Sequence, residues 1–175
     1  MSKQKFKKIW YLVGLLVLAN LAVWAAQSKA EVKNFGKLYF FDVGQGDAIY
    51  LRTVAGNDVL IDTGPGDAVV SKLGRVMPYF DRKLELVILT HPHADHISGM
   101  AELLKRYKVE KVLLPNAEYD SATYRQVLGE LAQKDVFIVR PKLGQRIFLD
   151  DSTVLDIYYP IVQFDNPEKI KDIND

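Results

Sequence analysis

Every histidine of this 175-residue sequence falls in one run of six residues, His91-Pro92-His93-Ala94-Asp95-His96. Neutral imidazole nitrogens and a carboxylate oxygen are typical zinc ligands, and manganese and iron accept the same donors. Cysteine is absent from the sequence, so neither thiolate ligands nor disulfides are available. Scattered core or surface histidines would not cluster in this way, and we therefore expect the run to bind metal.

The spacing of the four donors bears on how many ions they hold. His91 and His93 are expected to converge on one ion. Asp95 and His96 are adjacent, so their side chains point in different directions, and they are expected to face a second ion. Two ions about 3.5–4 Å apart can share a hydroxide and lower its pKa, and Asp95 is expected to orient that hydroxide as the catalytic residue. A structural metal site, a single-metal site and metal-free surface or capping histidines remain alternatives.

A buried strand and a helix are expected to position this run. The stretch Leu84 to Leu89, apolar apart from Glu85, is typical of a strand buried on both faces, and it leads directly into the histidines. After them, Met100, Leu103, Leu104 and Tyr107 recur at helical spacing. A loop between a strand end and a helix is where functional side chains are commonly placed.

The rest of the sequence alternates strand and helix patterns, which predicts a layered α/β domain. Gly56-Asn57 suits a hairpin turn, Pro78 is expected to end one helix early, and Asp120 or Ser121 is expected to cap another. Further strands are expected over residues 37–43, 48–54, 58–61, 111–114, 136–139, 146–149 and 153–159, and helices around residues 69–80 and 124–131.

Residues 1–30 differ in composition from the rest. Residues 9–26 are apolar apart from Asn20, which is long enough for a helix at 1.5 Å per residue to cross a membrane. We favour a retained anchor over a cleavable signal peptide, for which residues 28–30 offer a cleavage site, and over a buried core helix. The basic start would stay cytoplasmic and place residues 31–175 outside. Its lysines are Lys3, Lys5, Lys7 and Lys8.

The charge balance changes once this leader is set aside. Residues 31–175 carry 18 basic and 22 acidic side chains, a formal net charge of −4. A polyanion-binding domain usually shows a basic surplus, so the charge gives no support for nucleic-acid binding. A small basic cluster is interpreted as a solvated face. It consists of Lys105, Arg106, Lys108 and Lys111.

Three motifs together resemble the metallo-β-lactamase superfamily, and within it the ComEC-like branch of DNA-uptake membrane proteins and their stand-alone relatives. They are residues 41–48 (FDVGQGDA), 60–64 (LIDTG) and 89–96 (LTHPHADH), and the resemblance runs from about residue 37 to 160. The family fold is a four-layer αββα sandwich. The motif run lies in its first half, and we expect this sequence to be truncated to that N-terminal half.

The resemblance implies a role for each motif residue. His91 and His93 match ligands of a first metal, and Asp95 and His96 match ligands of a second. Asp62 matches an acidic residue that braces the ligand loop without binding the metal, although a turn-forming role is the alternative. Asp42 and Asp47 suit turn chemistry and are not expected to take part directly.

The expected function is an exported, membrane-anchored, metal-dependent hydrolase with two zinc ions in a complete domain, acting on DNA or another phosphodiester. β-Lactam, thioester and other ester hydrolysis stay open, since fold and metal site do not fix the substrate. No histidine follows His96, and four ligands divided over two metals leave each with two. The alternatives are therefore a non-catalytic half-domain or interaction module, and a subunit whose metal site a partner chain completes.

Overall fold

The computed structural model describes residues 3–29, 35–115 and 119–159 and divides into two units, Met1–Asn34 and Phe35–Asp175. The first unit is one helix, α1 (Lys3–Lys29), which contains the expected apolar residues 9–26. Its described side chains are exposed, and over residues 7–24 it is long and apolar enough to cross a membrane. Ala30, the end of the expected cleavage site, lies outside the described residues.

The second unit is built on a six-stranded mixed sheet whose strand order follows the sequence. The first three strands pair antiparallel and the third to sixth pair parallel. The strands are β1 (Lys37–Phe40), β2 (Ile49–Arg52), β3 (Asp58–Ile61), β4 (Lys83–Ile88), β5 (Lys108–Leu113) and β6 (Phe137–Val139). The α/β prediction is thereby confirmed.

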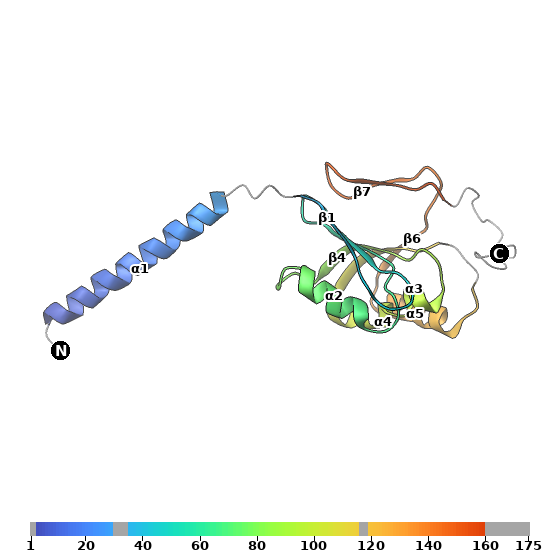
Figure 1. Ribbon diagram of the computed structural model, residues 1–175, viewed down its shortest axis with the longest axis horizontal. Helices are drawn as coiled ribbons and strands as arrows, with labels where there is room; N and C mark the ends of the chain where they lie inside the picture. Colours follow the sequence, from blue (N-terminus) through green and yellow to red (C-terminus); the bar gives the residue numbers. More distant parts are fainter. Residues whose placement is uncertain (1–2, 30–34, 116–118, 160–175) are drawn as a thin grey trace. The chain divides into compact units, whose positions relative to one another are not determined.

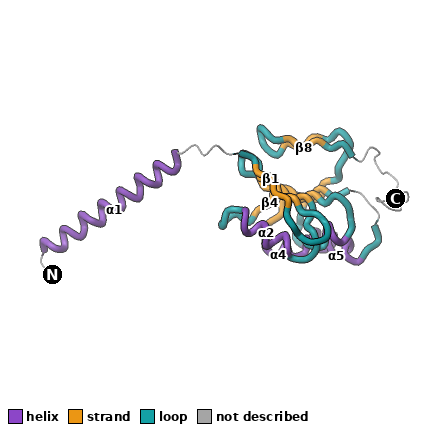
Figure 2. Tube along the Cα trace, viewed as in Figure 1, coloured by secondary structure: helices purple, strands orange, loops and turns teal. Residues whose placement is uncertain are grey.

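Helices connect the parallel strands, and the connections explain the layers. Parallel crossovers are almost always right-handed, so strands laid down in sequential order place their helices on one face of the sheet. Figure 1 shows α2, α4 and α5 on one face and the β7–β8 hairpin on the other, and Figure 2 shows the same layers by element type. The helices are α2 (Ala68–Val76), α3 (Ala94–Ile97), α4 (Met100–Arg106) and α5 (Ala122–Gln133), and the hairpin strands are β7 (Arg146–Phe148) and β8 (Val154–Asp156).

Two apolar cores lie on the two faces of the sheet. Successive side chains of a strand point to opposite faces, so Leu60 and Val87 pack under the helices while their neighbours Val59 and Leu86 pack under the hairpin. This explains why β4 is apolar apart from Lys83 and Glu85. The hairpin face is covered only in part, because other apolar side chains on it stay more than half exposed. These are Leu38, Phe40 and Phe137.

Most expected elements agree with the structure within a few residues. Strand 58–61 has the expected bounds, Gly56 takes the hairpin turn with φ +90°, and Ser121 caps α5 by accepting from the backbone N–H of Tyr124 at 3.1 Å. Helix α2 ends at Val76, before Pro78. The one-turn helix α3 was not expected, and it carries Asp95 and His96.

Candidate metal centre

Parallel pairing brings two distant parts of the sequence to one edge of the sheet. Asp62 directly follows β3, and the histidine run follows its parallel neighbour β4, so both lie where these strands end. The backbone N–H of Asp62 donates to the carbonyl of Ile88 at 2.8 Å and extends this pairing past the strand. Both the backbone N–H and the hydroxyl of Thr63 donate to the carbonyl of His96, at 2.8 and 2.9 Å. The short helix α3 is thereby tied to the end of β3.

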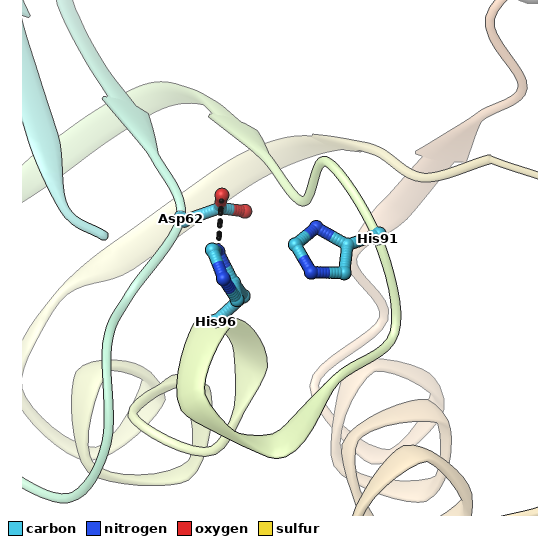
Figure 3. Close-up of side chains that lie close together, drawn as sticks. All are labelled: Asp62, His91 and His96. Atoms are coloured by element: carbon cyan, nitrogen blue, oxygen red, sulfur yellow. Dashed lines mark hydrogen bonds and ion pairs between the residues drawn. The ribbon is translucent and has the colours of Figure 1, made fainter. Parts of the chain in front are cut away.

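Asp62 is buried, with 2% of its surface exposed, and both carboxylate oxygens accept hydrogen bonds from the motif loop. Oδ1 accepts from the backbone N–H of Thr90 at 2.8 Å. Oδ2 accepts from the Thr90 hydroxyl at 2.6 Å and lies 2.9 Å from Nδ1 of His96 (Figure 3). A carboxylate bonded in this way positions the loop and its ligands, as the resemblance implies.

The hydrogen bonds around Asp62 fix which imidazole nitrogens can bind metal. An ionised Asp62 only accepts, so Nδ1 of His96 carries the proton and Nε2 keeps its lone pair. The Thr90 hydroxyl donates its proton to Asp62, so it accepts from Nδ1 of His91 at 2.9 Å. His91 and His96 therefore each present Nε2 as the free ligand atom.

Possible donor atoms of three side chains gather at this end of the sheet. Donor atoms of Asp62, His91 and His96 lie within 4.8 Å of one another, and the His91 and His96 ring centres are 3.9 Å apart. Nε2 of His96 lies 4.0 Å from Oδ2 of Asp95. Two ligand atoms of one tetrahedral zinc ion lie about 3.3–3.6 Å apart, so this adjacent pair would have to close by a few tenths of an ångström to share an ion. The nitrogen and carboxylate set fits zinc, manganese or iron.

His93 lies beside this group and outside the cluster of three. It precedes α3, and its carbonyl accepts from the backbone N–H groups of His96 and Ile97 at 3.0 and 3.1 Å. Its ring lies edge-on to His91, with centres 4.8 Å apart, and 5.4 Å from the ring of Tyr119. Its assignment as a metal ligand, like those of His91, Asp95 and His96, stays a prediction.

The electrostatics favour neutral imidazole at His91. Burial lowers the pKa of His91, and the neighbouring positive charge that a protonated His96 would carry lowers it further. A lowered pKa keeps the ring unprotonated near pH 7, which is the form that binds a metal.

Two glycines let other loops approach the centre, and their role was missed from the sequence. A Cβ on Gly46 would lie 1.9 Å from the carbonyl oxygen of Asp95, and one on Gly99 would lie 2.5 Å from that of Thr63. The first motif thus supports the loop that carries Asp95. The expected turn role of Asp42 is seen in its acceptance of the Gly44 N–H at 3.2 Å.

Comparison with known proteins agrees with the motifs. The family model of the metallo-beta-lactamase superfamily matches residues 41–171. ComE operon protein 3 of Bacillus subtilis is 28% identical over 133 residues, covering 66% of this chain and 17% of that protein. Ribonuclease Z of Aeropyrum pernix is 28% identical over 116 residues, covering 65% of this chain and 35% of that protein. The chain thus spans 17% and 35% of these two relatives' length.

Solved structures of the same superfamily are more distant. The Rm3 metallo-beta-lactamase is 20% identical with a TM-score of 0.46, covering 71% of this chain and 49% of that chain. The metallo-beta-lactamase fold protein YhfI from Bacillus subtilis is 21% identical with a TM-score of 0.42, covering 63% and 44%. The family model matches most of the chain, and the resemblance stated from the motifs is confirmed: the chain belongs to the metallo-beta-lactamase superfamily, a family of metal-dependent hydrolases.

Proposed function

We propose that this protein is a membrane-anchored, metal-dependent phosphodiesterase that acts on DNA outside the cytoplasm. The observation that carries the metal-dependent part is the gathering of His91 and His96 at the buried Asp62, with Oδ2 of Asp95 4.0 Å from Nε2 of His96. The similarity to a ribonuclease Z supports a phosphodiester bond as the target. The long helix α1, with four lysines at its N-terminal end and an apolar stretch after them, supports the anchor and its direction.

The residues of the candidate metal centre have separate roles. His91 and His96 offer Nε2 to the metal, and Asp62 and Thr90 hold these rings in the tautomer that binding requires. A bound zinc ion supplies Lewis acidity and lowers the pKa of the attacking water. The carboxylate of Asp95 is one third exposed and lies 4.0 Å from Nε2 of His96, where it can orient the water and take its proton.

Hydrolysis of a small phosphodiester tests this function directly. With zinc present, the chain should hydrolyse bis(p-nitrophenyl) phosphate and single-stranded DNA, and Asp95→Asn should lower kcat about 100-fold or more. Asp151→Asn is a matched control, because Asp151 is exposed in the β7–β8 turn. Hydrolysis of the β-lactam nitrocefin or of a thioester, without phosphodiester cleavage, would move the protein to another reaction of the same superfamily.

The alternative is a half-domain that binds metal only with ligands from a partner chain. It is favoured by the confinement of all histidines to residues 91–96, which leaves two protein ligands for each of two ions. A zinc-loaded chain that hydrolyses neither phosphodiester nor β-lactam, and that gains activity when a second polypeptide is added, would favour this alternative.

A further inference from the structure

Three arginines from separate segments line one groove on the helical face of the sheet. Arg75 lies in the last turn of α2, Arg106 lies in the last turn of α4, and Arg82 directly precedes β4. The groove has a volume of about 620 Å³ and is also lined by Asp67 and Tyr107. Volumes of roughly 300–1,000 Å³ are typical of sites for small organic ligands.

The groove is positive in a domain that is negative overall. Three guanidinium groups face one carboxylate, that of Asp67, whereas residues 31–175 carry a net charge of −4. Arg106, interpreted from the sequence as part of a solvated basic face, is exposed in the fold. It also lines the groove with Arg75 and Arg82, which are distant from it in sequence.

Arg82 is held in place by an aromatic side chain. Its Nη1 donates to the hydroxyl of Tyr107 at 3.1 Å, and its Cζ lies 5.5 Å from the centre of that ring. Tyr107 is itself buried, and the carbonyl of Arg82 accepts from the backbone N–H of Lys108 at 2.7 Å. One guanidinium is thus oriented before any ligand arrives, which lowers the entropy cost of binding.

The other two guanidiniums have no acidic partner in the described ranges 3–29, 35–115 and 119–159. No ion pair there involves Arg75 or Arg106, whereas other arginines of the domain pair with aspartates. Those arginines are Arg52, Arg125 and Arg146. An unpaired guanidinium offers several N–H donors in a planar fork that matches the oxygens of a phosphate.

The arginine end of the groove lies away from the metal centre. Arg82 precedes β4 and His91 follows it, and the six residues of this strand span about 20 Å. A ligand held by the three arginines would therefore occupy its own site.

We propose that this groove binds an organic phosphate of nucleotide size, at a site separate from the metal centre. Arg75 and Arg106 bind the phosphate oxygens together with the pre-oriented Arg82. The proposal does not depend on phosphodiesterase activity, because none of the three arginines belongs to the metal-binding run.

Calorimetric titration of the 175-residue chain in a neutral detergent tests the proposal, with ADP as the probe and EDTA present to exclude metal-bound phosphate. We expect saturable binding at one ADP per chain, weakened about tenfold or more by Arg75→Gln and by Arg106→Gln. Arg125→Gln removes the same charge from α5 and should leave the affinity unchanged, as should His96→Ala. Circular dichroism checks that each variant is folded.

Several results would overturn the assignment of this groove as a phosphate site. They are the absence of saturable ADP binding at millimolar concentration, an equal loss with Arg125→Gln, and a loss with His96→Ala, which would place the phosphate at the metal centre. Arginine-dependent binding to phosphatidylglycerol vesicles without ADP binding would assign the surface to lipid headgroups and would likewise overturn it.

Discussion

Two buried aspartates lie at the two ends of β3, and they differ in the groups that donate hydrogen bonds to their carboxylates. Asp58 opens the strand with 1% of its surface exposed, and Asp62 follows it with 2% exposed. Asp58 accepts from the hydroxyl of Tyr50 at 2.6 Å and from Nη1 of Arg52 at 2.7 Å. Asp62 accepts instead from Thr90 and His96. Among the described residues, no lysine or arginine forms an ion pair with Asp62.

The difference separates a structural carboxylate from a functional one. The charge of Asp58 is matched by the fixed cation of Arg52 on the neighbouring strand. Within the described part of the chain, the only group that can balance the charge of Asp62 is the imidazole of His96. This imidazole carries a positive charge when it is protonated, and it brings the positive charge of a metal ion close to Asp62 when it binds that ion. A buried carboxylate without a fixed counter-ion lowers the stability of the fold, so we infer that the role of Asp62 is to position the metal ligands.

The largest effect on stability is expected from Asp58→Ala. Removing Asp58 leaves the hydroxyl of Tyr50 without its acceptor and leaves Arg52 with only the partly exposed Asp81, which should lower the free energy of unfolding by about 3–5 kcal/mol. Chemical denaturation measures this loss. Asp81 also pairs with Arg52 but is partly exposed, so Asp81→Ala should cost less than about 1 kcal/mol. Equal losses from the two variants would contradict the structural role of Asp58.

Gly46→Ala should disturb the metal end of the sheet more than Gly44→Ala. Both glycines have positive φ, +90° and +85°, so each alanine carries a similar backbone cost of about 1–2 kcal/mol. Only at Gly46 would the new Cβ meet the carbonyl of Asp95, which should add about 1–3 kcal/mol and weaken zinc binding. Thermal denaturation and zinc titration of both variants check the difference, and identical behaviour would rule out the close contact.

Asp62→Asn should weaken metal binding while leaving the fold nearly as stable. Loss of a carboxylate that orients a ligating histidine lowers metal affinity about 10–100-fold, or about 1.4–2.7 kcal/mol. Without metal, the variant removes a buried charge that lacks a fixed counter-ion but also removes one hydrogen-bond acceptor of Thr90 or His96, so the free energy of unfolding should fall by less than about 2 kcal/mol. Competition with a zinc chelator measures the affinity. A stability loss as large as that of Asp58→Ala would show that both aspartates are structural.

A separate effect is the pH dependence that Asp58 contributes. Burial raises the pKa of Asp58 to about 6 from an ordinary 3.8, against the lowering effects of Tyr50 and Arg52. The folded state then binds more protons than the unfolded state between these two pKa values. The stability that protonated Asp58 contributes is therefore fully present below about pH 4 and is lost as the pH rises through about 6. The free energy of unfolding falls over this window by at most about 1.4 kcal/mol per pH unit. The stability difference between wild type and Asp58→Asn should fall over this window, and a rise would contradict the raised pKa.

The sequence predicted those parts of the molecule that depend on local pattern. The bounds of β3, the apolar strand before the histidines and the cap at Ser121 follow from hydrophobic spacing and turn residues. The bracing role of Asp62 was implied by the family motif. Its hydrogen bonds to Thr90 were not foreseen, because they depend on parallel pairing of strands more than 20 residues apart.

Other contacts left no local signal in the sequence. Gly46 belongs to the first motif, residues 41–48, but nothing in that motif indicates that it accommodates the carbonyl of Asp95, 49 residues later. Asp58 was assigned only to a strand, since its pairing with Arg52 depends on the register of the β2–β3 hairpin. Non-local contacts of this kind become visible only when the sheet is assembled.

Zinc content per chain tests the metal centre most directly. The 175-residue chain should be purified in a neutral detergent, dialysed against trace zinc and measured by elemental analysis beside His93→Ala and His96→Ala. We expect one to two zinc ions per wild-type chain and less in both variants. A wild-type chain without zinc, or variants with the wild-type stoichiometry, would contradict the assignment of residues 91–96 as a metal centre.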